Sequence, residues 1–247
     1  MSTRAEVCAV ACAELFRDAG DIMISPMTNM ASVGARLARL TFSPDILLTD
    51  GEAQLLADTP ALGKTGAIEG WMPFGRVFET LAWGRRHVVM GANQVDRFGN
   101  QNISAFGPLQ HPTRQMFGLR GAPGNAINHS TSYWVGNHSK RVFCEAVDVV
   151  CGIGWDKIDP DNPAFRFANP YRVVSNLGVF DFNGPGRTMR AVSLHPGVSP
   201  DDVRENTSFE VDGLDEAEET RLPTDDELRL IRDVIDPKAL RDREIRS

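Results

Sequence analysis

The sequence is short of positive charge. It has 26 lysines and arginines against 33 aspartates and glutamates, which gives a formal net charge of −7. A nucleic-acid backbone attracts an excess of basic side chains, so this balance argues against a nucleic-acid partner. The overall negative charge does not exclude a local basic pocket that binds a phosphate group.

Cysteine and histidine are also scarce. The four cysteines are too irregularly spaced to match a common zinc pattern, and the five histidines form no metal constellation. We therefore expect no metal site, and we interpret the cysteines as reduced core residues of a cytosolic protein. They are Cys8, Cys12, Cys144 and Cys151.

Long apolar runs are missing as well. The first residues include Arg4 and Glu6, which argues against a signal peptide, and no stretch is apolar enough to cross a membrane. We expect a cytoplasmic protein without a membrane partner. The sequence also has neither a G-x-S-x-G elbow nor a P-loop, which argues against a serine hydrolase of that type and against a P-loop nucleotide hydrolase.

The chain does contain enough apolar material for a sizeable core: 42% of its 247 residues are hydrophobic. Short apolar strands alternate with helical patterns, which predicts an α/β fold with an open, mostly parallel sheet and flanking helices. We predict one domain over residues 1–247, with a charged tail from about residue 238 that is mobile or packs on a partner.

The local signals predict the following elements. Helices are expected from the capping box at Thr3–Glu6 to a stop at Gly20, from a Thr28 cap towards Arg39, and from an acidic start at Pro223–Glu227. Strands are expected at Asp21–Ser25, Asp45–Thr49, His87–Met90, Arg141–Cys144, Tyr171–Ser175 and Met189–Leu194, with a turn within Asn176–Asp181 and a loop over Thr59–Gly75.

Polar segments follow two of these strands, where ligands gather in open α/β sheets. Asp50 and Glu52 flank Gly51 directly after the predicted strand Asp45–Thr49. They could act as nucleophile or general base, or form only a solvated turn. The segment Gly91–Asn102 follows the predicted strand His87–Met90 and is rich in amides and glycines. It suits hydrogen bonding to a polar ligand, or a hairpin turned at Arg97–Asn100.

A third polar segment, Gly121–Asn125, is rich in glycine and precedes a possible helix. Such a loop can direct backbone N–H groups at a developing oxyanion, although Gly-Pro segments are often simple loops.

Four motifs in order resemble the β subunit of class I CoA-transferases, such as the glutaconate and 3-oxoacid CoA-transferases. The stretch Gly91–Asn102 is similar to that family's G-x-x-Q-V/I-D-R-Y-G-N-x-N, and Gly121–Ala126 to its glycine-rich loop. The other two are Val174–Phe180, similar to V-x-x-L-G-V-F, and Leu194–Val198 with Val203 and Glu205–Thr207, similar to H-P-G-V…V-x-x-N-T.

The resemblance implies a CoA-transferase (NagB/RpiA-like) fold and an α-type partner subunit, typically in an α2β2 heterotetramer. It also implies an active site at the subunit interface and an acyl-CoA substrate. Because this substrate already carries coenzyme A, no separate cofactor is expected. On this basis the residues assigned to substrate binding are Asn93, Gln94, Gly121, Ala122, Gly124 and Asn125.

The segment Thr49–Glu52 departs from the family pattern. Family transferases carry a catalytic glutamate in an S-E-N/S-G motif at this place; here Asp50 is one methylene shorter and Glu52 is displaced in register. A misplacement of about 1 Å can cost about a hundredfold in rate, so covalent CoA transfer through either residue is in question.

The whole chain resembles an actinobacterial subgroup with this departure, the steroid-ring hydrolases. The similarity includes the Cys8/Cys12 helix, the Trp71–Gly75 loop and the Thr224–Arg232 helix. It implies that water opens the last ring of a cyclic keto-enoyl-CoA in cholesterol catabolism. The main glutamate would lie on the α subunit, with Asp50 and Glu52 in support. Two alternatives stay open: true CoA transfer between carboxylic acids, and a non-catalytic scaffold subunit.

Overall fold

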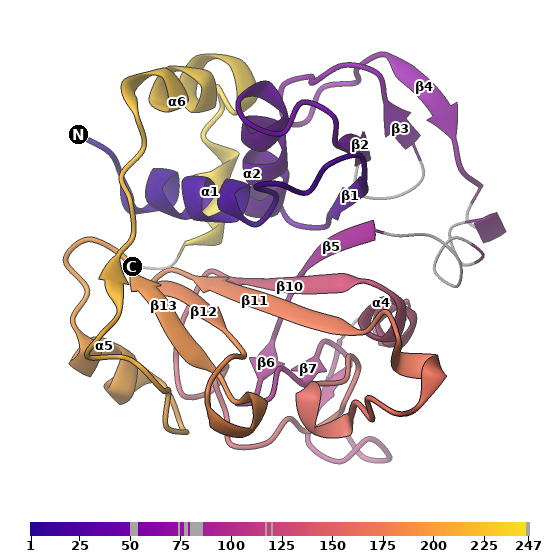
Figure 1. Ribbon diagram of the computed structural model, residues 1–247, viewed down its shortest axis with the longest axis vertical. Coiled ribbons are helices and arrows are strands. Elements are labelled where there is room, and N and C mark those ends of the chain that lie inside the picture. Colours follow the sequence, from indigo (N-terminus) through magenta and orange to yellow (C-terminus); the bar gives the residue numbers. More distant parts are fainter. Residues whose placement is uncertain are drawn as a thin grey trace.

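The computed structural model describes residues 1–49, 54–73, 75–76, 79, 86–116, 118–119 and 121–245. Its centre is a ten-stranded sheet in the order β14-β13-β12-β11-β10-β5-β1-β2-β3-β4 (Figure 1). Neighbouring strands within the central segment β2-β1-β5-β10-β11 are all parallel. These strands are β1 (Met23–Pro26), β2 (Leu47–Thr49), β5 (Arg86–Gly91), β10 (Ser130–Val135) and β11 (Asn169–Ser175).

Antiparallel strands extend both sides of this parallel centre, and only the outermost β14 pairs parallel with its neighbour. The predicted open, mostly parallel sheet is therefore confirmed. These outer strands are β3 (Gln54–Leu56), β4 (Ile68–Trp71), β12 (Gly178–Asp181), β13 (Arg190–Leu194) and β14 (Glu218–Glu219).

Two hydrophobic clusters cover the two faces of the sheet, because side chains alternate along each strand. In β10, Trp134 joins the cluster beneath the first helices, whereas Tyr133 and Val135 join the opposite cluster. Figure 1 shows α1, α2 and α6 on one face and α4, α5 and the short strands β6 and β7 on the other. The helices are α1 (Arg4–Glu14), α2 (Asn29–Leu40), α4 (Ala122–Asn128), α5 (Pro200–Asn206) and α6 (Asp225–Arg229).

The predicted helix starts are confirmed. Thr3 and Glu6 form a complete capping box at α1, Thr28 caps α2, and Thr224 forms a capping box with Glu227 at α6. These local motifs satisfy the free N–H groups of the first turn without help from the rest of the fold, which is why sequence alone reveals them. No helix in the described part of the chain is long and apolar enough to cross a membrane.

Two predictions of local structure were wrong, and one strand was missed. Arg141–Cys144 is a turn with one isolated bridge from Phe143 to Val95, rather than a strand. The predicted loop over Thr59–Gly75 contains the edge strand β4, and β10 at the middle of the sheet was missed.

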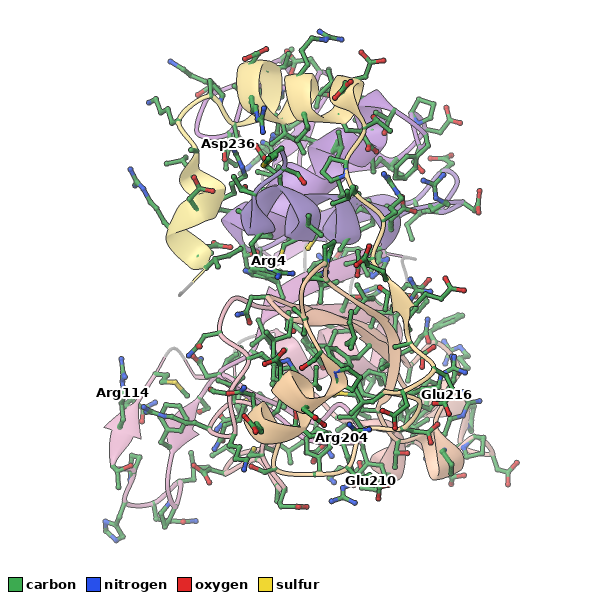
Figure 2. All side chains as sticks on the ribbon, turned by 90° about the vertical axis from the view of Figure 1, so that its left-hand side faces the viewer. Arg4, Arg114, Arg204, Glu210, Glu216 and Asp236 are labelled. Atoms are coloured by element: carbon green, nitrogen blue, oxygen red, sulfur yellow. The ribbon has the colours of Figure 1, made fainter. Side chains whose placement is uncertain are left out.

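The charged tail packs on its own chain. Arg241 is 5% exposed and pairs with Asp236 at 3.0 Å and with Glu6 of α1 at 3.3 Å. Glu6 also pairs with Arg232 at 2.7 Å. Figure 2 places Asp236 where the C-terminal segment meets the helical layer. The tail therefore joins α1 to the α6 region through a buried ion network.

Candidate active site

The carboxyl ends of the parallel strands form the edge at which ligands bind in open α/β sheets. At this edge β5 ends at Gly91, between β1 and β10. A hairpin of β6 (Gln94–Val95) and β7 (Gln101–Asn102) follows β5 immediately. The amide-rich segment predicted from the sequence therefore lies at this edge. It also forms the hairpin that the sequence section gave as the alternative to ligand binding, so both interpretations of this segment are compatible.

The turn of the hairpin is held by Asp96. Its carboxylate accepts hydrogen bonds from the backbone N–H groups of Phe98 and Asn100, both at 3.0 Å, and from the Asn100 side chain at 2.8 Å. Burial raises the pKa of Asp96, and these hydrogen bonds offset only part of the rise. Gly99 has a φ of +85°, and a Cβ there would lie 2.7 Å from the Phe182 ring. The turn therefore requires glycine at this position.

Asn93 and Gln94 have different surroundings. Gln94 is buried; its carbonyl oxygen accepts from Asn102 at 2.6 Å and from the Asp148 N–H at 3.0 Å, and its amide donates to the Asp148 carboxylate at 3.2 Å. Asn93 is exposed, and its backbone N–H donates to the Asn102 carbonyl. Asn93 can reach a ligand, whereas Gln94 holds the hairpin in shape.

The predicted glycine-rich loop is the first turn of α4 itself, with Gly121 as the residue before the helix. Ala122 and Asn125 are buried, and Gly124 is half-buried. The Asn125 amide donates to the Met90 sulfur at 3.6 Å, beside the end of β5. Gln101 of the hairpin donates to the carbonyl of the adjacent Gly91 at 2.6 Å. The second and third predicted segments therefore both contact β5, the hairpin at Gly91 and α4 at Met90.

A buried cation supports this arrangement, and sequence reasoning missed it. Arg86 is 3% exposed and donates to Asn125 Oδ1 and to Ser25 Oγ, the latter at 3.3 Å. It has no carboxylate partner among the described residues, and burial lowers its pKa to about 10, so it stays charged at neutral pH. An arginine ahead of a strand is an ordinary pattern, so its sequence carried no specific signal.

Five buried or partly buried histidines and cysteines of the described residues do not provide a ready nucleophile. Burial lowers the pKa of His87 and His138 to about 3 and that of His195 to about 4. Burial raises the pKa of Cys8 to about 12 and that of Cys144 to about 11, so these thiols are protonated at neutral pH. Among the residues whose placement is described, no group of three or more His, Cys, Asp or Glu side chains could hold a metal ion.

Asp50 and Glu52, the predicted catalytic carboxylates, lie outside the described residues. The preceding residue, Thr49, ends β2 in the parallel part of the sheet, and its hydroxyl donates to the Ile24 carbonyl of β1 at 3.2 Å. The catalytic and substrate-binding roles assigned from the sequence remain predictions.

An open, mostly parallel sheet with an amide-rich hairpin at its carboxyl edge and a short helix packed beside β5 and β10 is the architecture of a CoA-transferase-fold subunit. A search of family models gave no match. The IpdB subunit of the cholesterol ring-cleaving hydrolase of Mycobacterium bovis is 87% identical over 250 residues, covering 100% of both chains. The crystal structure of Rhodococcus jostii RHA1 IpdAB contains a chain that is 67% identical with a TM-score of 0.97, covering 100% of this chain and 99% of that one.

A more distant relative is the β-type subunit of the glutaconate CoA-transferase of Acidaminococcus fermentans, which is 28% identical over 95% of this chain and 93% of its own length. The chain therefore belongs to the family of IpdB subunits of the cholesterol ring-cleaving hydrolase, within the wider group of CoA-transferase-fold proteins.

Proposed function

We propose that this chain is the β-type subunit of a heteromeric acyl-CoA hydrolase that opens the last steroid ring in cholesterol catabolism. The observation that carries the proposal is the 87% identity along the full length of a chain named as that subunit. The more distant transferase shares only 28% of its residues with this chain. The hydrolase is therefore better supported than CoA transfer between carboxylic acids.

In the proposed reaction, a glutamate of the α-type partner takes a proton from water, and the water oxygen adds to the ketone carbon of the ring enone. The bond from that carbon to its α carbon then breaks in a retro-Claisen cleavage, so that the former ketone becomes a carboxylate and the α carbon takes up a proton. Negative charge spreads onto the ketone oxygen during addition and onto the thioester oxygen during cleavage.

Hydrogen-bond donors that are already in place stabilise such charge, each contributing about 3 kcal/mol. This chain supplies the Asn93 amide and, in the first turn of α4, the Gly124 N–H. The N–H groups of Ala122 and Asn125 already donate to Leu119 and Gly121, and Pro123 has none.

Arg86 acts as a positioning residue in this scheme. Its hydrogen bond to Asn125 fixes the first turn of α4 against β5, and its positive charge lies beside that turn. Asp50 and Glu52, which follow β2 in the sequence, orient water or a bound group in this scheme.

The proposal extends to the setting of the enzyme. The active complex is an α2β2 heterotetramer in the cytoplasm, and it needs no cofactor beyond the coenzyme A that the substrate carries. The absence of a membrane-spanning helix among the described residues is compatible with this location.

Replacing Asn93 tests the contribution of this chain to the chemistry. In the assembled complex, Asn93→Ala is expected to lower kcat by about 10²-fold, because one oxyanion donor is lost. Steady-state kinetics with the cyclic keto-enoyl-CoA measures the effect. Gln110→Ala, which removes an exposed amide outside the hairpin, is the matched control and should leave kcat unchanged. An intact Asn93→Ala complex with unchanged kcat would favour the scaffold alternative instead.

A further inference from the structure

The C-terminal segment of the chain ends on the first turn of helix α2. Its last helical turn, Leu240–Glu244, contacts both α1 and α2. Figure 1 shows this segment in yellow, passing from α6 alongside the two helices toward the sheet. The Glu244 carboxylate accepts hydrogen bonds from the backbone N–H groups of Asn29 at 2.8 Å and Met30 at 2.9 Å. Glu244 follows Asn29 by 215 positions, so this contact is purely tertiary.

Helix α2 has no local anion for its amino end. The Thr28 side chain accepts only from the Ala31 N–H, at 3.1 Å, and the first turn contains no acidic residue. The free N–H groups of a first turn need acceptors, and the positive end of the helix dipole favours a carboxylate. Glu244 supplies both, from the opposite end of the chain.

The main chain of Glu244 reaches the central strand β10. Gly136 directly follows β10, and a Cβ at this position would lie 1.7 Å from the Glu244 carbonyl oxygen. That distance is far inside van der Waals contact, so only glycine permits the close approach. Glu244 therefore contacts the start of α2 with its side chain and the end of β10 with its backbone.

These two contact points lie on either side of β5, because β5 pairs with β1 on one side and with β10 on the other. Between β1 and α2, the Met27 N–H donates to the Val89 carbonyl of β5 at 2.9 Å. A Cβ at Gly91, the last residue of β5, would lie 3.8 Å from the Thr28 methyl group. Asn93, which we assign to charge stabilisation, follows two residues later. The contacts of Glu244 thus continue to the end of β5.

The Glu244 carboxylate is presented from an anchored backbone. The Asp236 carboxylate accepts from the N–H groups of Leu240 at 2.8 Å and Arg241 at 3.0 Å. Arg241 also belongs to the buried ion network with Glu6, and Ile245 packs against the hydrophobic cluster beneath α1 and α2. A carboxylate held in this way loses little further freedom when it binds the helix.

We propose that Glu244 is a positioning residue for the reaction. Through it, the C-terminal segment holds the start of α2 and the end of β10, and so fixes the end of β5 from which Asn93 extends. The structural part, that the carboxylate holds α2, stands on the contacts alone. The catalytic part, that this hold supports turnover, rests on the proposed function. Glu244 acts through the backbone and does not touch the substrate.

Thermal unfolding of the assembled complex tests the structural part. Glu244→Ala is expected to lower the unfolding midpoint by about 2–4 °C, the usual effect of losing one helix cap in a chain of this length. Formate is a carboxylate small enough to replace the missing group. At constant ionic strength, formate in place of chloride should recover most of the shift in the variant and leave the unaltered complex unchanged, since only the vacated position binds it.

Asp242→Ala is the matched control. It removes a carboxylate two residues earlier whose side chain is 54% exposed, and it should show neither the shift nor the response to formate. An unchanged midpoint in Glu244→Ala, or a response to formate no greater than that of the unaltered complex, would overturn the structural part.

Steady-state kinetics of the same complexes test the catalytic part. A misplacement of about 1 Å can cost about a hundredfold, so a smaller shift at the end of β5 is expected to lower kcat of Glu244→Ala about tenfold, with KM for the acyl-CoA nearly unchanged. Formate should restore kcat. Glu244→Gln keeps the shape and one oxygen acceptor, and it should lose only about threefold. Full kcat in an assembled Glu244→Ala complex would overturn the catalytic part.

Gly136→Ala displaces the same segment without removing the carboxylate. It is expected to lower kcat about as much as Glu244→Ala, and formate should not restore it. Because both substitutions release one segment, the double variant should lose no more than either single variant. Losses that multiply would contradict a single hold. If the unaltered complex does not open the ring of the acyl-CoA, the proposed function fails, whereas the response of the unfolding midpoint to formate still decides the structural part.

Discussion

Omission of the partner subunit is expected to lower turnover of the cyclic keto-enoyl-CoA by at least about 10²–10⁴-fold, because loss of a general base alone costs that much. In this chain, burial keeps His87, His138 and His195 neutral at neutral pH, and it keeps the Cys8 and Cys144 thiols protonated. None of these five groups therefore replaces the general base that we propose for the partner subunit.

A titration of this chain with the purified partner measures that dependence. Activity should rise linearly with added partner and reach a plateau at equal amounts of the two subunits. The control is Gln110→Ala, whose exposed side chain lies away from the hairpin and which should give the same plateau. If this chain alone turned over the substrate at a rate near that of the complex, the assignment of the base to the partner would be wrong.

Arg241→Ala is expected to lower the free energy of unfolding by about 3–5 kcal/mol, because it leaves two buried carboxylates without a shared cation. Those carboxylates, on Glu6 and Asp236, are each 1% exposed. Urea unfolding followed by circular dichroism measures the loss. Arg243→Ala in the same turn removes an exposed arginine and should change the stability by less than about 0.5 kcal/mol. Equal effects of the two substitutions would show that the network does not stabilise the fold.

The same network predicts how stability depends on pH. Burial raises the pKa of Glu6, but hydrogen bonds from Arg232 and Thr3 and the charges of Arg232 and Arg241 outweigh it and hold this pKa at about 2, below the ordinary 4.5. A lowered pKa stabilises the folded state above pH 4.5, and this contribution is lost as the pH falls towards 2. At about 1.4 kcal/mol per pKa unit it amounts to about 3 kcal/mol. Arg241→Ala should reduce this acid sensitivity.

The parts of the fold that could be predicted are those whose signal is local. Capping boxes, short apolar strands and the Gly99 turn depend on residues within a few positions of one another. The central strand β10 was missed because Ser130, Thr131 and Ser132 make it look polar. Its hydroxyls are satisfied by distant partners: Ser132 bonds to His87 of β5 at 2.9 Å, and Thr131 donates to the Asn125 carbonyl of α4 at 3.3 Å. Such tertiary hydrogen bonds leave no local pattern.

The incorrect prediction of a strand at Arg141–Cys144 has a similar cause. Its apolar side chains are buried by tertiary contacts rather than by a sheet ladder: the Phe143 ring stacks on His138 with 3.5 Å between ring centres. An apolar run predicts burial, and burial in a turn looks the same in sequence as burial in a strand.

Two segments of the candidate site, the hairpin and the first turn of α4, stood out by their amides and glycines, and the family resemblance then covered both. Within each segment, the sequence could not separate a residue that faces a ligand from one that supports the backbone. Asn93 and Gln94 are adjacent, yet one is exposed and the other is enclosed by Asn102 and Asp148. Arg86 was missed because its significance lies in what it lacks, a carboxylate partner, and only the packing reveals that.

A single turnover in water enriched with heavy oxygen tests the central claim most directly. The assembled complex is mixed with less than one equivalent of the cyclic keto-enoyl-CoA, and the ring-opened product is analysed by mass spectrometry. Hydrolytic ring opening predicts one heavy oxygen atom in the new carboxylate and coenzyme A still joined to the product. An unlabelled product, or coenzyme A trapped on the enzyme as a thioester, would contradict it.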